Sequence, residues 1–432
     1  MSKPATEESK LVLTDDGTIL TTATASDEVV DYPDGGKRAW LTVLGSFCMF
    51  FAGLSLMNSI GAYETWISGH QLANESPGRI GWIFGFYNFM SFFAGIPLGP
   101  VFDVKGPLPL LLVGSVLLIA TYLLLSICKV YWHFLLCLGL VGSLSTCLLF
   151  TASVGTIQHW FLRRRGIATG CAISGGSVGG IVFPLILGKL LPRIGFAWTM
   201  RVTTLIMLPC LAAGCLLLRG RLQRAFSWKG ILPNPRLLLN PQLSVLTAGA
   251  FFVELGLFIP MTYIASYAVA NGASSQAAYN VVTLLNVGSF IGRWLPGYIG
   301  DKLGRFNAQV CALFLSLVAI FGIWKQAGTS TGALFAFAVV FGIGSGSGIS
   351  LVPVCIAQLC DTKDYGKTFT AVYSIASIGS LIGVPLGGRI LESSNGEYSG
   401  LIMFAGSAYV VALLCFIAVR IMGIGVSPIK KF

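Results

Sequence analysis

The sequence predicts an all-α protein that crosses a membrane twelve times, and three observations predict it. Of its 432 residues, 55% are hydrophobic and only 10% are charged, whereas soluble globular domains carry about 25% charged residues. Apolar runs long enough to cross a bilayer as helices recur along the whole chain. Lysines and arginines gather in the short segments between alternate runs, as they do in polytopic membrane proteins.

Twelve apolar runs have the length of a membrane-spanning helix. A helix rises about 1.5 Å per residue, so about twenty apolar residues cross the roughly 30 Å hydrocarbon layer. By this rule the predicted spans are 40–62, 80–101, 107–127, 133–155, 166–188, 196–218, 243–268, 278–300, 308–325, 331–355, 367–390 and 399–421. Because twelve is even, both ends of the chain lie on one side of the membrane.

The distribution of positive charge predicts which side that is. Cytoplasmic segments are enriched in Lys and Arg. With the amino terminus in the cytoplasm, twenty Lys and Arg residues fall in cytoplasmic segments and six in the opposite ones, so both termini are predicted to be cytoplasmic. The plasma membrane is the default expectation, and a vacuolar or other internal membrane stays open. No basic start followed by a short apolar stretch and a cleavage site predicts a signal peptide.

The first 36 residues differ from the rest of the chain. They hold eight of the seventeen acidic residues, have a net charge of −6 and are rich in Thr, Ser and Ala, which predicts a disordered acidic cytoplasmic tail. The remainder carries +17, and its basic residues sit in short clusters between apolar spans. That pattern does not predict a nucleic-acid partner, which would require a basic soluble face.

The longest polar interruption, 219–242, is basic and contains Pro233, Pro235 and Pro241. It divides the chain into two sets of six spans. The predicted parts are a tail at 1–36, a six-helix bundle at 37–218, a cytoplasmic linker at 219–242, a second six-helix bundle at 243–421 and a cytoplasmic tail at 422–432.

The two halves repeat a motif at the end of their second span. GPVFDVKG at 99–106 and GYIGDKLG at 297–304 share the spacing G-x-x-x-D-x-x-G, with an offset of 198 residues. Gly166 and Pro184 of the fifth span also correspond to Gly366 and Pro385 of the eleventh. Two parallel six-helix repeats predict two bundles that rock against each other, with a binding site between them near the bilayer midplane.

Glycines recur every four residues in the fifth span, as Gly166 with Gly170, Gly175 with Gly179 and Gly176 with Gly180. An interior glycine disfavours a helix by roughly 1 kcal/mol relative to alanine, so the pattern predicts a groove into which another helix packs closely. The eleventh span repeats this spacing at Gly379, Gly383 and Gly387.

Two further motifs stand at the entries to the first and fifth spans. The first is PDGGKRAW, with Asp34, Gly35, Gly36 and Trp40. The second contains Trp160, Phe161, Arg163, Arg164, Ala168, Gly170, Ala172, Ser174, Gly175 and Gly179. Together with the duplicated G-x-x-x-D-x-x-G, they resemble the major facilitator superfamily and, within it, the monocarboxylate transporter family, especially its fungal branch. The resemblance covers residues 33 to about 425.

This resemblance implies the major facilitator fold and a secondary carrier that moves small carboxylates, either linked to protons or by facilitated diffusion. The fungal branch also resembles carriers of other metabolites, including riboflavin-like uptake and secondary-metabolite export. In animal members, a lysine in the first helix and an aspartate one turn before an arginine in the eighth are tied to coupling. The matching positions here are Asn58 and Ser289, and the arginine is Arg293.

The sequence is therefore consistent with three functions. The expected one is a carrier of a small monocarboxylate or other carboxylate-bearing metabolite. The alternative is a proton-antiport exporter of a larger neutral secondary metabolite, which the absent lysine and aspartate favour and Arg293 disfavours. A non-transporting nutrient sensor usually requires a long cytoplasmic extension, and the predicted tails of 36 and 11 residues are short.

Arg293 is the first candidate for substrate binding, because a charge within a span is disfavoured by about 3 kcal/mol and usually faces a cavity or a partner. A guanidinium can grip a carboxylate with two parallel hydrogen bonds. It could instead reach the headgroups or brace another helix. Five polar residues within spans would line the same cavity or, alternatively, contact neighbouring helices: Asn58, Tyr87, Asn88, Asn286 and Tyr373.

Glu254 is the one carboxylate that these spans place deep in the membrane. A buried carboxyl group favours its protonated form, so Glu254 is the candidate for proton coupling, with a static hydrogen bond to a neighbouring helix as the alternative.

A second group of charged residues lies at the cytoplasmic ends of spans, where charges in related carriers form and release gate contacts. The gating candidates are Asp103, Asp301, Lys302, Arg305, Arg163 and Arg164.

The sequence predicts no enzyme, metal or cofactor. It lacks the patterns GxxxxGK[ST] and HExxH, and GIGSGSGIS at 342–350 lies in an apolar span, where it predicts helix packing. The three histidines have no companions at metal-ligand spacing, and most of the eleven cysteines lie in apolar runs without a CxxC pair. The expected partners are a small-molecule substrate, protons and the lipid bilayer.

Overall fold

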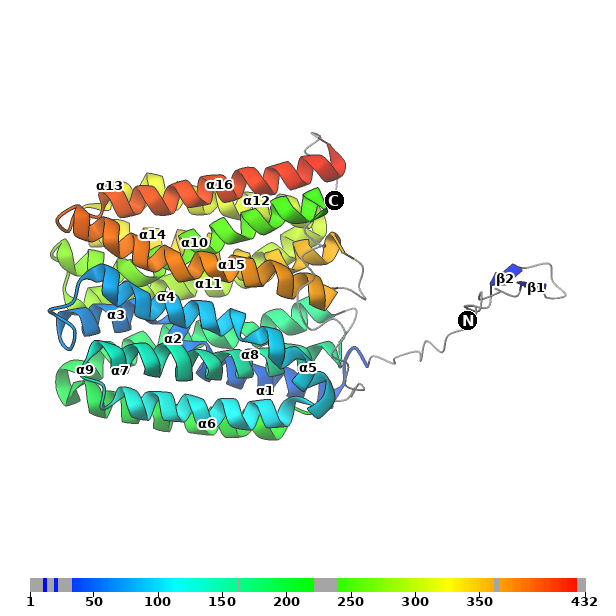
Figure 1. Cartoon of the computed structure of the whole chain (residues 1–432), viewed down its shortest axis with the longest axis horizontal. Helices are drawn as coiled ribbons and strands as arrows, with labels where there is room; N and C mark the ends of the chain where they lie inside the picture. Colours follow the sequence, from blue (N-terminus) through cyan, green and yellow to red (C-terminus); the bar gives the residue numbers. More distant parts are fainter. Residues whose placement is uncertain are drawn as a thin grey trace, which may run out of the picture.

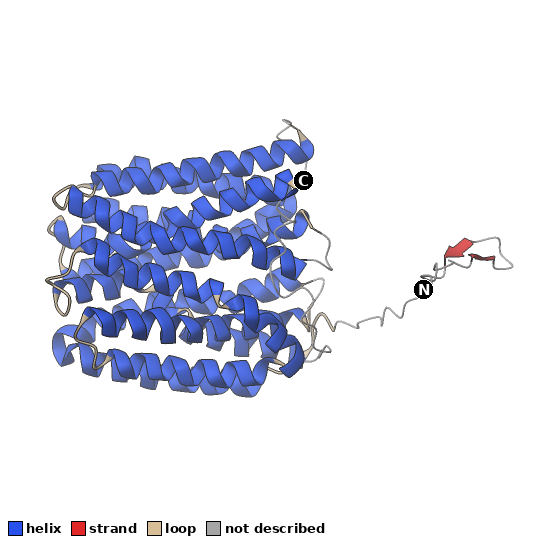
Figure 2. Ribbon diagram, viewed as in Figure 1, coloured by secondary structure: helices blue, strands red, loops and turns tan. Residues whose placement is uncertain are grey.

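A computed structural model of the chain describes residues 11–13, 19–21, 33–161, 164–220, 239–360 and 365–425. Within these ranges the chain is helical apart from two short strands (Figures 1 and 2). Strand β1 (Leu11–Leu13) pairs antiparallel with β2 (Ile19–Thr21), with Val12 opposite Leu20. This pairing lies in the tail for which the sequence predicts disorder. The apolar and β-branched side chains of these two short runs suit a strand.

The first half contributes six crossings. The first consists of α1 (Lys37–Gly53), α2 (Ser55–Asn58) and α3 (Ile60–Gly69), and the second of α4 (Pro77–Phe93) and α5 (Gly95–Lys105). The third is α6 (Pro107–Leu125), and the fourth joins α7 (Tyr131–Leu136), the π-helix η1 (Cys137–Gly142) and α8 (Ser143–Gln158). The fifth and sixth lie in α9 (Arg165–Leu217), which Gly195 divides with a φ of 73°.

The second half contributes the other six. They are α10 (Pro241–Ala270), α11 (Ser275–Leu303), the series α12 (Arg305–Leu317), η3 (Val318–Trp324) and α13 (Lys325–Ala327), then α14 (Thr331–Gln358), α15 (Tyr365–Ser393) and α16 (Ser399–Ile424).

Among the described residues, nine helical stretches are long and apolar enough to cross a membrane. One of them, Ile167–Leu217, makes two crossings about Gly195. The broken first crossing and α11 add two more, which gives the twelve that the sequence predicts. Most helices run past the predicted ends, most of all in the first crossing, which continues to Gly69 rather than 62, whereas α6 ends at Leu125 rather than 127.

The helices form two bundles, one from each half of the sequence, which lie one above the other in Figure 1. We call the side that holds Lys37 and Gly425 the terminal face, and the opposite side the far face. Within the halves, α9 packs on α1 and α15 packs on α10. Across the halves, α4 packs on α15, α9 on α11 and α3 on α10. These contacts form the interface between the bundles.

The glycine groove of α9 holds another helix, as predicted. The α-carbon of Gly175 lies against the carbonyl group of Phe47 in α1, and Gly179 lies against that of Phe51, so closely that a methyl group at either glycine would overlap it. The two backbones can approach this far only because glycine has no side chain.

The second half of the chain repeats these glycine–carbonyl contacts at positions 204 residues further along the sequence. Gly379 lies against the carbonyl group of Phe251, and Gly383 against that of Leu255. Both helices of each pair are shifted by the same number, so the internal repeat extends to individual backbone contacts. With this offset, Pro184 corresponds to Gly388. The predicted correspondence between Pro184 and Pro385 is therefore wrong, because the two prolines do not occupy equivalent positions in the repeat.

Candidate functional site

The first crossing is broken near its middle, and a side chain from the second half of the chain binds the backbone carbonyl group that the break leaves unpaired. Helix α2 ends at Asn58, and the amide groups of Ala62 and Tyr63 both donate to the carbonyl of Ser59. The carbonyl oxygen of Asn58 is instead bound by the side-chain amide of Asn286 on α11, at 2.8 Å. The side chain of Asn58 in turn donates to the carbonyl of Gly176 on α9, at 2.8 Å. Two predicted site residues thus meet between the halves.

Asn88 on α4 lies 198 residues before Asn286, which is the offset of the duplicated G-x-x-x-D-x-x-G motif. It is fully buried, and neither its side-chain oxygen nor its nitrogen has a hydrogen-bond partner among the described residues. An unpaired buried amide is unfavourable by about 1–3 kcal/mol. A ligand that donates and accepts hydrogen bonds would satisfy it.

Arg293 on α11 faces the other half rather than lipid. Its side chain is 4% exposed, and Nη1 donates to the carbonyl of Ile173 on α9 at 2.8 Å. Its Nε has no partner among the described residues. The one ion pair in the described part of the chain joins other residues, so no described carboxylate neutralises this guanidinium. It braces α9 with one hydrogen bond and leaves a buried positive charge without an anion.

The two tyrosines among the candidates differ in their surroundings. The hydroxyl of Tyr87 is paired with that of Thr146 at 2.9 Å, inside the first bundle, which favours the helix-contact alternative. The half-buried ring of Tyr373 lies 4.5 Å from Phe369 and 5.9 Å from Phe92 of α4, measured between ring centroids. Tyr373 therefore lies at the interface between the halves.

Glu254 on α10 is buried, and its Oε2 has no hydrogen-bond partner among the described residues. It lies close enough to interact electrostatically with Tyr409 on α16, a neighbour in the same bundle. This places a carboxyl group in the second bundle, as the sequence indicates.

A second buried carboxyl group, that of Glu64, was not predicted from the sequence. Glu64 on α3 is 3% exposed and accepts a hydrogen bond from the hydroxyl of Ser266 on α10. The hydroxyl of Thr65 lies 3.2 Å from the same Ser266 hydroxyl. The predicted first span ended at 62, before this residue. The signal that could have extended it is the helical spacing of Tyr63 and Ile67, both of which are buried.

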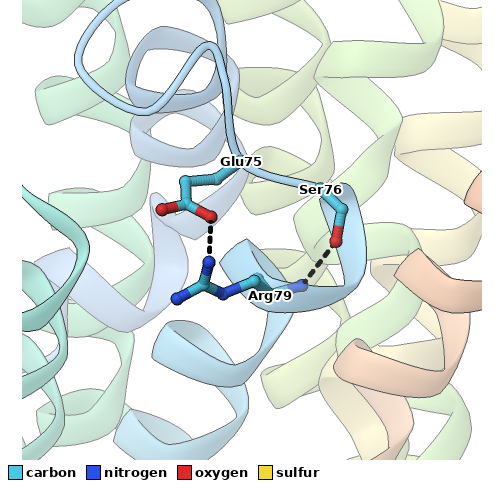
Figure 3. Close-up of polar contacts among 3 residues, drawn as sticks. All are labelled: Glu75, Ser76 and Arg79. Carbon is cyan, nitrogen blue, oxygen red and sulfur yellow. Dashed lines mark hydrogen bonds and ion pairs between the residues drawn. The ribbon is translucent and has the colours of Figure 1, made fainter.

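In the far-face loop that leads into α4, the charged side chains of Glu75 and Arg79 pair with each other (Figure 3). Arg79 forms an ion pair of 2.6 Å with Glu75, and its backbone amide donates to the hydroxyl of Ser76 at 3.4 Å, which caps α4. The guanidinium also lies 4.7 Å from the ring centroid of Tyr131. Arg79 is therefore engaged on this loop.

On the terminal face, the two entry motifs contact each other. The backbone amide of Asp34 donates to the carbonyl of Trp160 at 3.0 Å, and its carboxylate accepts from the backbone amide of Arg164 at 3.3 Å. The rings of Trp40 and Phe161 meet edge to face at 5.5 Å. Asp34 thus places a negative charge at the start of α9, where the helix dipole favours it.

The gating candidates are described only in part. Arg164 is exposed, and Arg305 is half-buried at the first position of α12. The side chains of Asp103, Asp301, Lys302 and Arg163 lie outside the described residues. Among the residues that are described, no three His, Cys, Asp or Glu side chains gather as a metal site would require.

Comparison with known proteins identifies the family. The sequence matches the Major Facilitator Superfamily over residues 45–324 and 246–428. The chain belongs to this superfamily. The structure of a mutant of the nucleoside transporter NupG has the same fold, with a TM-score of 0.70 over 89% of this chain and all of that one, at 14% sequence identity.

Three curated fungal relatives are alike over most of their length. A riboflavin transporter of Saccharomyces cerevisiae is 31% identical over 93% of this chain and 81% of its own. The agnestins efflux protein of Paecilomyces divaricatus is 31% identical over 93% of both chains. The fujikurins efflux protein of Gibberella fujikuroi is 30% identical over 93% of this chain and 86% of its own. This major facilitator protein is a multi-pass membrane transporter.

Proposed function

We propose that this transporter carries a small organic metabolite that bears a carboxylate group, by alternating access between the two faces of the membrane. The observation that carries the proposal is the position of Arg293, which is buried between the halves and has no carboxylate partner among the described residues. Such a charge is unfavourable by about 3 kcal/mol or more in the membrane, and an anionic substrate would neutralise it.

The chemistry of the surrounding groups fits a carboxylate with a polar remainder. A guanidinium binds a carboxylate through parallel N–H groups, and the Nε of Arg293 is available for one of them. We assign the side-chain amide of Asn88 and the side-chain oxygen of Asn286 to the rest of the substrate, because both are buried without a hydrogen-bond partner among the described residues. We add the ring of Tyr373, which lies at the interface. Asn58 and Tyr87 are then supporting residues, because their side chains already bind helices of the first bundle.

The gate on the terminal face belongs to the same proposal. We assign it to Asp103, Asp301, Lys302, Arg305, Arg163 and Arg164, on the strength of the duplicated motif and its position at the helix ends. The positive charge of the terminal segments supports a cytoplasmic terminal face, and we propose the plasma membrane as the location.

The second candidate is export of a neutral secondary metabolite. Two of the relatives are efflux proteins, and Asn58 and Ser289 stand where the monocarboxylate branch has charged residues. Arg293 separates the candidates, because a neutral cargo needs no cation.

The test is transport by the full-length protein in liposomes, with a panel of monocarboxylates and the methyl ester of each. We expect the acids to be carried and the esters not. Arg293→Ala should lower uptake at least about tenfold, since a hydrogen bond to a charged group contributes about 1.5–3 kcal/mol, and Arg293→Lys should restore it only in part.

Arg201 provides the matched control, because it also lies within a span but stacks on Trp198 at 4.8 Å. Arg201→Ala should transport normally. Equal uptake of acids and esters, or normal uptake by Arg293→Ala that reaches the membrane, would refute the acid-carrier proposal and favour neutral export.

A further inference from the structure

The far-face ends of α3 and α10 are the place where the first crossings of the two halves touch. Gly61 of α3 lies so close to the carbonyl oxygen of Met261 that a side chain there would overlap it. About one turn further along these helices, Glu64 and Thr65 meet Ser266 through their side chains. Nearby, the hydroxyl of Tyr263 donates to the carbonyl of Val384 at 2.9 Å. The far face is closed at this point.

Glu64 lies inside this closed contact, and no lysine or arginine in the described part of the chain forms an ion pair with it. Two ionisable groups near Glu64 lie on neighbouring elements. They are the hydroxyl groups of Tyr263 on α10 and of Tyr398 just before α16, and both interact electrostatically with Glu64. On its own helix, the hydroxyl of Ser68 donates to the carbonyl of Thr65 at 3.3 Å, and the ring of His70 is stacked on Trp66 at 3.7 Å.

Among the described residues of their far-face ends, α11 and α4, which also pack on α3, offer no free cation either. The described far-face end of α11 holds Tyr279 as its one ionisable group. The far-face end of α4 holds Arg79, which is paired with Glu75 (Figure 3). Among the described residues, no lysine or arginine neutralises Glu64.

The closed contact therefore favours one protonation state of this carboxyl group. A lone carboxylate at 3% exposure loses its hydration and gains no counter-charge, which is unfavourable by several kcal/mol. A neutral carboxylic acid can instead both donate to and accept from the hydroxyl groups around it. When α3 and α10 separate, water reaches the group and stabilises the charged form.

We infer that Glu64 is a proton-binding site that holds the far face closed. The inference rests on the alternating access of the proposed function. The proton comes from water on the far face as the helices close, and it returns there as they open. Because the closed state binds one proton more than the open state, acid on the far face favours closure and alkali favours opening. One linked proton changes the ratio of the two states by at most about tenfold per pH unit.

The experiment follows the conformation and needs no substrate. The full-length protein in nanodiscs is compared in acidic and alkaline buffer by hydrogen–deuterium exchange of the peptides that cover 59–70 and 262–272, corrected for the intrinsic effect of pH. We expect strong protection in acid that falls as the pH rises. Glu64→Gln, which mimics the neutral acid, should stay protected at both pH values. Ser266→Ala should lose protection at both.

Two control variants separate Glu64 from its titrating neighbours. Glu75→Gln and His70→Gln should each keep the pH dependence of the unmodified protein. Infrared spectroscopy of the acidic sample should also show a protonated carboxyl band that Glu64→Gln weakens. A Glu64→Gln protein that keeps the full pH dependence, or that leaves the carboxyl band unchanged, would overturn the inference. Loss of carboxylate transport alone would refute only the proposed function.

Discussion

A single side chain, that of Asn286, satisfies the backbone carbonyl that the break in the first crossing exposes. Replacement by alanine would leave this carbonyl unpaired in the middle of the membrane. We expect Asn286→Ala to lower the free energy of unfolding by about 1–3 kcal/mol, measured by thermal unfolding in detergent. Asn280→Ala, on the exposed end of the same helix, should change little. Equal melting temperatures for the two variants would show that the hydrogen bond contributes nothing.

Asp34 acts on a helix to which it does not belong. Its carboxylate accepts from the backbone amide of Arg164, the N-cap residue of α9. Asp34→Ala should therefore destabilise the first bundle by about 0.5–2 kcal/mol, and Asp34→Asn, which keeps an acceptor oxygen, by less. Thermal unfolding of both variants measures the difference. An Asn variant as unstable as the Ala variant would assign the effect to the charge rather than to the cap.

At the residue scale, the sequence shows which polar groups lie within spans but not what they face. Arg293 could be selected because a lone charge interrupts an apolar run, and the structure places it between the halves. Glu64 was not predicted to lie within a span, because a charge that follows an apolar run is typical of the end of a span. Its burial depends on Ser266, which lies 202 residues away.

At the scale of helices, the glycine contacts explain how the first and fifth crossings approach each other. Gly175→Ala should push α9 away from the Phe47 carbonyl and destabilise the protein by about 1–3 kcal/mol, and Gly379→Ala should do the same in the second half. Thermal unfolding tests both.

Gly170 provides the control within the same helix, because an added methyl group there meets nothing within 4 Å. Gly170→Ala should be neutral or stabilising by up to about 1 kcal/mol, since alanine favours a helix. A Gly175→Ala protein as stable as Gly170→Ala would contradict the close packing.

The helices themselves were predictable because twenty apolar residues in a bilayer have few alternatives to a helix. Their interruptions were not. The break at Ser59 contains no proline, and it is stabilised by Asn286 from the other half. The π-helical segments η1 and η3 likewise lie within unbroken apolar runs.

At the scale of the whole molecule, the duplicated motifs predicted two related bundles but not how they meet. The repeated contacts at an offset of 204 confirm the relation between the halves. The arrangement itself depends on the far-face contacts of α3 with α10 and of α4 with α15, which no spacing within one helix encodes. Transport by alternating access requires these contacts to open and close in each cycle.

The most direct test of this account is a reversible cross-link across the far face. The hydroxyl oxygens of Thr65 and Ser266 are 3.2 Å apart, so Thr65→Cys combined with Ser266→Cys should form a disulfide when oxidised. The account predicts that oxidation stops transport in liposomes, that reduction restores it, and that neither single substitution responds. Undiminished transport by the fully cross-linked protein would contradict alternating access between the two halves.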